Sequence, residues 1–317
     1  MYHTILVPLD GSPLAEAALP VATDLAQRTG AQLFLVHVTT RATTTPIFVE
    51  GLPVVDEQLH SLSKLHAQTY LEQIRDRLSA TANLQVTVQL LDPYAPAEQE
   101  QTAPALLATY ATTINADLIV MMSHGRGGLA RFWLGSVADA LVRLNPAPIL
   151  LLRALDDTQK PIQTEPVQRI IIPLDGSTRS ESILPYALAL GQTLGARYTL
   201  MHVNVPTLPS QVPPFITPTL LDTEQTARER TSAQRYLEMI AQGIRSTGAL
   251  VETQVLVNDQ VAVAILDESR RDGYSLIAMS TTGRSGLRRL LLGSVADKVL
   301  RRAEVPMLLH RDSEKGV

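Results

Sequence analysis

The 317-residue sequence contains no cysteine, which excludes disulfide bonds and thiolate metal sites and is consistent with a reducing compartment. The chain also has little net charge, because its 27 lysines and arginines nearly balance its 31 acidic residues, which leaves a formal charge of −4. Without a basic surface, binding to nucleic acid or to acidic membranes is disfavoured. No apolar run approaches the roughly 18 residues of a membrane span, and no signal-peptide pattern precedes the first apolar run. We therefore expect a soluble, cytoplasmic protein with no nucleic-acid or membrane partner.

What the chain does contain is two motifs that each occur twice. Residues 5–12, Ile-Leu-Val-Pro-Leu-Asp-Gly-Ser, return at 170–177 as Ile-Ile-Ile-Pro-Leu-Asp-Gly-Ser. A glycine-rich segment over 125–139 returns over 283–297. The copies are 165 and 158 residues apart, which is too long for a solenoid repeat and suits two whole domains, each with its own core. The sequence therefore predicts a tandem duplication.

The duplication predicts one domain over 1–154 and a second over 168–312. The segment between them, 155–167, is polar and carries two prolines, as linkers do. In both copies, short apolar runs rich in β-branched residues alternate with stretches of helical spacing. Several runs are apolar on both faces, which suits the interior of a parallel sheet. The alternation predicts the α/β class, with two open, doubly wound parallel sheets and helices on both faces of each.

The expected elements follow from these runs. Strands are expected at 4–9, 32–38, 85–91, 117–122 and 148–153 in the first copy, and at 169–174, 197–203, 250–257, 275–280 and 306–310 in the second. Helices are expected in the first copy at 14–28, 57–79, 104–114 and 136–144. Proline- and threonine-rich loops over 39–56 and 204–222 are interpreted as surface connections, with a lid over the strand ends as the alternative.

The glycine segments are the part of the sequence that indicates chemistry. Glycines within 125–128 follow the fourth expected strand, and Gly135 and Ser136 open a helix. Glycine lets backbone amides approach an anion closely, and a helix start adds unpaired N–H groups and the positive end of the helix dipole. Phosphate is therefore the expected ligand.

An alternative interpretation of the same helix starts needs no ligand. Ser136 and Ser294 would be helix N-caps only, with Asp139 and Asp297 three residues later completing a pattern like a capping box. A serine hydroxyl can serve as a cap or as a phosphate ligand, so both interpretations stay open. The glycine and arginine arrangement, present twice, favours anion binding.

The glycine segments resemble those of the universal stress protein family, which carry Gly, two residues, Gly, nine residues and then Gly-Ser or Gly-Thr. Gly125 and Gly283 are each followed by nine residues and Gly-Ser, and only the first glycine departs, being Met122 or Ser280. The resemblance covers nearly the whole chain, from the Pro-Leu-Asp-Gly-Ser motifs to the last strands. It implies an adenine nucleotide alpha hydrolase-like fold, with strand order 3-2-1-4-5. It also implies that the two terminal strands pair in an intramolecular pseudo-dimer, and it leaves a homodimer of chains open.

In the ATP-binding branch of that family, the nucleotide lies across the ends of the first and fourth strands. By this resemblance, the two Asp-Gly-Ser aspartates approach the ribose or a Mg²⁺ held by the phosphates. Backbone groups at the end of the second strand hold adenine, and the glycine segments and serines take the phosphates. The implied sites are Pro173, Asp175, Val203, Ser280, Gly283, Arg284, Gly293, Ser294 and Val295 in the second copy, and Pro8, Asp10, Val38, Met122, Gly125, Arg126, Gly135, Ser136 and Val137 in the first.

Two reservations limit this transfer. Met122 places a bulky side chain where the family has glycine, whereas Ser280 is small, so the second copy is the safer nucleotide site. Asp10 and Asp175 also have a structural interpretation, because an aspartate after a buried strand commonly caps the turn that starts the next helix.

No catalytic residue is assigned from the sequence. His37 and His202 end the second strands and are interpreted as satisfied, half-buried histidines. No serine, histidine and acid combination recurs in both copies, and no carboxylate pair shares an expected face near the glycines. His60 and His66 are six residues apart, so no metal site formed by the protein alone is expected.

Three functions are carried forward. The leading one is a stress-response protein that binds ATP and is regulated by occupancy, with at most slow hydrolysis. The second is an interaction scaffold of the same family that has lost nucleotide binding, which the departures at Met122 and Ser280 motivate. The third is an ATP-using enzyme, which nothing in the sequence demands. Protein partners are not indicated.

Overall fold

The structure is a computed structural model that divides into two compact units, one formed by the described residues up to 153 and the other by those from 166 onward. The expected linker over 155–167 lies almost entirely outside the described residues, so its limits stay a prediction. The structure describes residues 2–39, 47–49, 52–54, 57–82, 84–93, 102–123, 135–144, 147–153, 166–206, 223–271, 273–281 and 293–311.

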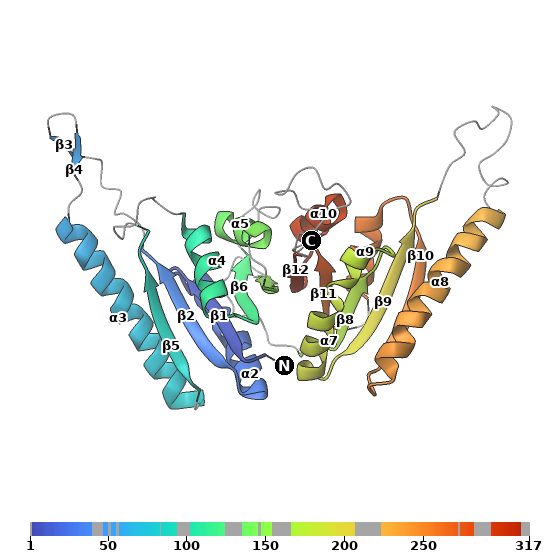
Figure 1. Cartoon of the computed structure of the whole chain (residues 1–317), viewed down its shortest axis with the longest axis horizontal. Helices are drawn as coiled ribbons and strands as arrows, with labels where there is room; N and C mark the ends of the chain where they lie inside the picture. Colours follow the sequence, from blue (N-terminus) through green and yellow to red (C-terminus); the bar gives the residue numbers. More distant parts are fainter. Residues whose placement is uncertain are drawn as a thin grey trace. The chain divides into compact units, whose positions relative to one another are not determined.

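The first unit is a parallel sheet with the strand order β5-β2-β1-β6-β7, which is the predicted 3-2-1-4-5 (Figure 1). Its strands are β1 (Thr4–Leu9), β2 (Gln32–Val38), β5 (Val86–Leu91), β6 (Leu118–Ser123) and β7 (Ile149–Arg153). Its helices are α1 (Pro13–Glu16), α2 (Leu19–Thr29), α3 (Glu57–Ala82), α4 (Ala103–Thr113) and α5 (Ser136–Leu144). Helix α3 packs on β2 and β5, and α4 and α5 pack on each other and on β2 and β6.

The second unit repeats this plan with the order β10-β9-β8-β11-β12. Its strands are β8 (Arg169–Pro173), β9 (Arg197–Asn204), β10 (Val251–Val257), β11 (Ser275–Ser280) and β12 (Met307–His310). Its helices are α6 (Thr178–Glu181), α7 (Leu184–Leu194), α8 (Thr223–Arg245), α9 (Val261–Ser269) and α10 (Ser294–Arg302). The predicted fold class is therefore confirmed in both units.

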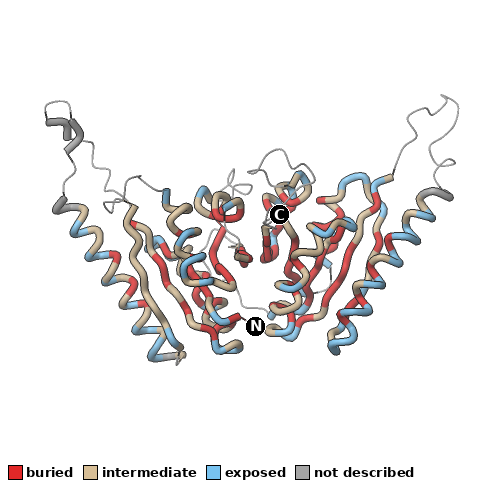
Figure 2. The backbone as a smooth tube through the Cα atoms, in the orientation of Figure 1, coloured by how far each residue is buried: buried red, intermediate tan, exposed pale blue. Residues whose placement is uncertain are grey.

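The core of each unit is its sheet, whose central strands are buried on both faces (Figure 2). Residues 5–7 in β1 and residues 170–172 in β8 are all 0% exposed, and every residue of β6 is buried. Burial on both faces explains why these runs are continuously apolar rather than alternating. Among the described helices, none is both long enough and apolar enough to cross a membrane.

The expected single helix over 14–28 is wrong, because the structure has two helices, α1 and α2, with a break at residues 17–18. Pro20 lies in the first turn of α2, and Pro185 lies in the first turn of α7. A proline cannot donate to the carbonyl four residues earlier and its ring clashes with that carbonyl, so a helix ends before it. The carbonyls concerned belong to Glu16 and Glu181, the last residues of α1 and α6.

Two connections differ from expectation or between the units. The first proline- and threonine-rich loop contains an antiparallel hairpin, β3 (Ile47–Val49) with β4 (Leu52–Val54), where only a loop was predicted. The connection from the third strand to the next helix covers residues 92–102 in the first unit but only 258–260 in the second. Because this connection is shorter in the second unit, the separation between matching residues falls from 165 before it to 158 after it.

Candidate functional site

The Asp-Gly-Ser motif forms the same tight turn in both units. Asp175 Oδ1 accepts hydrogen bonds from the Ser177 backbone N–H at 3.0 Å and from its hydroxyl at 2.5 Å. Asp10 Oδ1 accepts from the Ser12 N–H at 2.9 Å. The intervening glycines have φ angles of 79° and 82°, which only glycine adopts without strain. The structural interpretation of the two aspartates as turn caps is confirmed, and both side chains still lie exposed at the ends of the first strands.

A cavity of about 380 Å³ opens beside this turn in the second unit. It lies between the end of β9 and the amino-terminal half of α8. Its lining is mixed, with apolar side chains, one aromatic ring and several polar groups: Gly176, His202, Val203, Asn204, Val205, Glu229, Ser232, Ala233 and Tyr236. Gly176 follows the turn aspartate, and Val203 is one of the predicted adenine-binding positions, so the cavity adjoins two predicted parts of the site.

Three side chains beside the cavity form a chain of contacts. His202 Nδ1 lies 2.8 Å from the Leu174 carbonyl oxygen, so the protonated Nδ1 donates to that carbonyl. The His202 ring meets the Tyr236 ring edge to face, with centroids 6.5 Å apart. The Tyr236 hydroxyl donates to Glu181 Oε1 at 2.8 Å. Burial raises the pKa of Tyr236, and the hydrogen bond and charge of Glu181 raise it further.

The first unit repeats these residue types with one change of partner. His37 and Tyr70 meet edge to face with centroids 6.4 Å apart, and burial lowers the pKa of His37. Glu16 pairs with Arg77 at 3.1 Å, and the position of Arg77 in α3 corresponds to Gly243 in α8. The prediction of a satisfied, half-buried histidine is confirmed for His202, whose ring nitrogen has a backbone partner.

The capping interpretation of the two serines is wrong for the second unit. Gly293 is the N-cap of α10, with no side-chain capping hydrogen bond, and Ser294 is the exposed first residue of the helix. Asp297 forms no capping box, because its carboxylate accepts from Arg301 Nε at 2.9 Å one turn later. In the first unit Ser136 likewise begins α5 and Asp139 pairs with Arg143. Each aspartate forms an ion pair with the arginine four residues later, because residues i and i+4 are neighbours on the helix surface.

The other predicted site residues lie where the strands and helices adjoin. Met122 in β6 is 5% exposed, so its bulky side chain packs within the unit, and Ser280 is the last residue of β11. Four of them lie at or next to the last residue of a strand: Pro8, Val38, Pro173 and Val203. Three lie in the first turn of α5 or α10 or just before it: Gly135, Val137 and Val295. Gly125, Arg126, Gly283 and Arg284 lie outside the described residues.

Metal binding by the protein alone finds no support in the described part of the chain. No group of three or more histidine, aspartate or glutamate side chains that could hold a metal ion occurs there.

The two-unit fold and its strand-end turns have counterparts among known proteins. The profile described as the universal stress protein family matches residues 1–153 and 166–311. This chain belongs to the universal stress protein family. A universal stress protein of Mycobacterium tuberculosis is 29% identical over 202 residues, covering 62% of this chain and 63% of that protein, so the match spans less than two thirds of that relative. One of Mycolicibacterium smegmatis is 25% identical over 325 residues, covering 98% of this chain and 97% of that protein.

A solved structure supports the fold of this universal stress protein. A universal stress protein from Archaeoglobus fulgidus covers 98% of both chains with a TM-score of 0.69. The sequence identity is 18%, so this likeness concerns the fold alone.

Sequence reasoning missed several side chains that lie in or beside the cavity of this universal stress protein. Glu181, Tyr236 and Asn204 were not singled out, although a signal for the first two was present. Glu16 and Tyr70 return as Glu181 and Tyr236 after 165 and 166 residues, within one residue of the separation of the Asp-Gly-Ser motifs. Asn204 carries no such signal, because the first copy has Thr39 at that position.

Proposed function

We propose that this universal stress protein is a cytoplasmic stress-response protein that binds ATP at the strand ends of its second domain. The observation that carries the proposal is the cavity of about 380 Å³, because it adjoins Gly176 and Val203 at the ends of the first two strands. Parallel α/β sheets bind ligands in crevices at the carboxyl ends of their strands. A nucleoside would enter this cavity and its phosphates would extend toward β11 and α10.

The start of α10 supports the phosphate end of the proposal. Gly293 supplies no side-chain cap, so the first amides of the helix are not satisfied by the N-cap residue. Such amides and the positive end of the helix dipole favour a phosphate group. Ser294 adds an exposed hydroxyl at the first helical position.

Mg²⁺ would enter this site with the nucleotide rather than before it. The exposed Asp175 carboxylate lies just after β8, at the carboxyl ends of the strands, and Mg²⁺ is commonly held by one or two carboxylates plus substrate phosphates. Mg²⁺ would neutralise phosphate charge, while Asp175 would orient the ion or the ribose. Because no residue is placed as a general base, we infer regulation by occupancy rather than rapid turnover. We also propose, as the resemblance implied, that the last strands of the two domains pair with each other. The protein partners stay unidentified.

The test is equilibrium binding of Mg-ATP to the full chain, compared between two matched variants. Ser294→Glu and Ser136→Glu each place a negative charge at the first position of a helix, where it stabilises the helix but repels phosphate. We expect Ser294→Glu to weaken ATP binding by at least about tenfold, or about 1.4 kcal/mol, and Ser136→Glu to weaken it less. No ATP binding at millimolar concentration, with both domains folded, would refute the proposal.

A further inference from the structure

A carboxylate joins helix α3 to the ends of two strands in the first domain. Asp92 directly follows β5, and its side chain is 15% exposed. On one side, its Oδ2 atom pairs with the Lys64 ammonium and lies 3.3 Å from His60 Nε2, and both of these partners lie in the first half of α3. On the other side, its Oδ1 atom lies 3.3 Å from Oγ1 of Thr39, the residue after β2. Asp92 therefore bridges the helix and the strand ends.

The surroundings of Asp92 hold this bridge in place. Thr39 is 1% exposed, and its backbone N–H donates to the Leu91 carbonyl at 2.9 Å, so the strand side of the bridge is fixed. A carboxylate that is largely shielded from water needs a counterion and hydrogen bonds, and here it has both. Moving α3 away from the strand ends would take these partners from Asp92. The bridge therefore opposes that movement.

The second domain has other side chains at these positions. By the pairing of β9 with β10, Val257 stands where the first domain has Asp92. Val257 is 43% exposed and cannot pair with a cation. Arg230, at the position of Lys64, is exposed. These two side chains cannot form the bridge of the first domain, and the cavity of about 380 Å³ lies in this second domain, between the end of β9 and α8.

We propose that Asp92 and its three partners form a latch that keeps the crevice between the end of β2 and α3 closed to nucleotide in the first domain. The latch opens when the first half of α3 moves away from the strand ends while the rest of the domain stays folded. Local openings of this kind require less free energy than global unfolding. This inference rests on the proposed nucleotide function and adds its regulation, because a ligand that binds only the open state has its apparent affinity lowered by the small population of that state.

Hydrogen exchange of the full chain without ligand tests the latch itself. Asp92→Asn removes the charge, and Lys64→Met removes the counterion but keeps the length of the side chain. Each variant should speed exchange of the α3 amides between residues 64 and 71 by about tenfold and leave the β1 amides unchanged. Arg230→Met, the matched change in α8, should leave exchange in α8 unchanged.

Two results of this exchange experiment would overturn the inference. Unchanged exchange in α3 would show that Asp92 does not hold the helix. Equal acceleration in α3 and β1 would show that Asp92 stabilises the whole domain and forms no latch.

Calorimetric titration with Mg-ATP tests what the latch controls. The full chain carries Ser294→Glu, so that binding to the second domain is weakened. In this background Asp92→Asn should raise ATP affinity about tenfold, in proportion to the larger open population, and Arg230→Met should not change it. Faster exchange in α3 without a gain in ATP affinity would overturn the inference and leave the proposed function intact. No ATP binding to the parent chain or to Asp92→Asn would refute the proposed function, and with it the control of nucleotide by the latch.

Discussion

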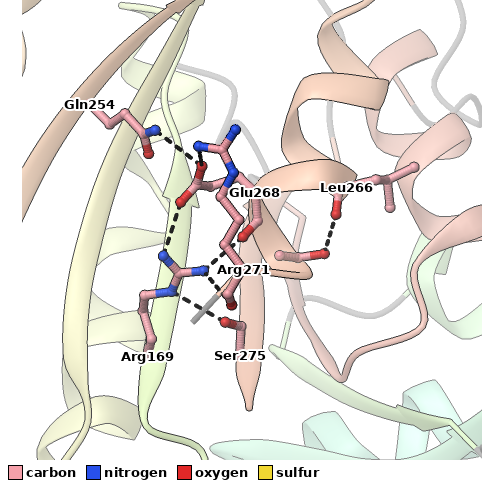
Figure 3. A network of polar contacts seen from close by, with 7 residues as sticks. Arg169, Gln254, Leu266, Glu268, Arg271 and Ser275 are labelled. Carbon is pink, nitrogen blue, oxygen red and sulfur yellow. Dashed lines mark hydrogen bonds and ion pairs between the residues drawn. The ribbon is translucent and has the colours of Figure 1, made fainter. Parts of the chain in front are cut away.

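Arg169 and Glu268 form a buried ion pair in the second domain, with Nη1 and Oε1 2.9 Å apart and each side chain 4% exposed. The Arg169 guanidinium also donates to the backbone carbonyls of Glu268 and Arg271 and to Ser275 Oγ (Figure 3). Glu268 in turn accepts from Gln254 at 3.0 Å. The pair joins the start of β8 to the end of α9, at the opposite end of β8 from Asp175. Its role is therefore structural rather than ligand binding.

Removing one partner of this pair should destabilise the second domain strongly. Glu268→Leu leaves the buried Arg169 without its counterion, which costs about 3–5 kcal/mol. Arg169→Met should cost less, because Glu268 keeps its second ion pair, with Arg271 at 3.2 Å, and the double variant should cost less than the sum. Hydrogen exchange of the slowest amides in β8 and β11 measures the change. The control is the exposed pair of Arg270 and Glu304, where Glu304→Gln should cost at most about 1 kcal/mol. Equal costs at the two sites would contradict the prediction.

Two glycines in helices should respond to alanine in opposite directions. A Cβ at Gly191 in α7 would lie 2.4 Å from the Tyr198 ring, so Gly191→Ala should destabilise the second domain by about 1–3 kcal/mol. At Gly243 in α8 nothing lies within 4 Å of a new Cβ, so Gly243→Ala should stabilise by up to about 1 kcal/mol. Thermal melting of the two variants checks the signs. A higher melting temperature for both variants would show that helix propensity, not the Tyr198 contact, decides the outcome. A lower one for both would contradict the prediction for Gly243.

The two roles assigned to Asp175 can be separated by substitution. Asp175→Asn keeps an oxygen that accepts from Ser177 but removes the charge, so stability should change little while Mg-ATP binding weakens. Asp175→Ala removes the turn acceptor as well and should lower the free energy of unfolding by a further ~1 kcal/mol. Urea denaturation and ATP titration measure the two effects. Unchanged Mg-ATP affinity in the asparagine variant would mean that Asp175 serves the turn only.

The first domain should lose stability as the pH falls below about 6.5, the ordinary pKa of histidine. Burial lowers the pKa of His37 in the folded state, and the Leu9 carbonyl and the Asp10 charge oppose this in part. Because the unfolded state then binds more protons, stability from this group is complete above about pH 6.5 and is lost as pH falls toward the lowered pKa.

The measurement for His37 is hydrogen exchange of the slowest amides in β1 and β2, which reports the stability of the first domain. Stability is compared at about pH 7.5 and about pH 5.5, on either side of the ordinary histidine pKa. His37→Phe keeps an aromatic ring against Tyr70 and removes the titration, so the pH dependence should become smaller. The same pH dependence in parent and variant would assign the effect to other groups.

The repeats and the strands could be predicted from sequence because each depends on local pattern. Continuous apolar runs such as residues 170–172 indicate strands buried on both faces, and the structure confirms them. The break between α1 and α2 was also open to prediction, since Pro20 excludes a hydrogen bond that a continuous helix requires. It was missed because apolar spacing alone was followed across residues 14–28.

Contacts between distant residues could not be predicted in this way. Arg169 and Glu268 are 99 residues apart, and nothing local to either residue indicates its partner. The unpaired amide of Asn204 becomes visible only when its neighbours are known. The capping box at Ser294 failed because the same Asp297 could pair with Arg301, and the spacing fits both. Most of each glycine segment, residues 125–134 and 283–292, lies outside the described residues, so the phosphate-binding role stays a prediction.

Thr39 and Asn204 stand at matching positions of two halves that share one polypeptide. Every molecule synthesised therefore holds one half of each kind, in a ratio that gene expression cannot alter. In a homodimer of single-domain chains, one mutation changes both subunits at once. Here a mutation in one half leaves the other untouched, so each half can change its sequence independently of the other.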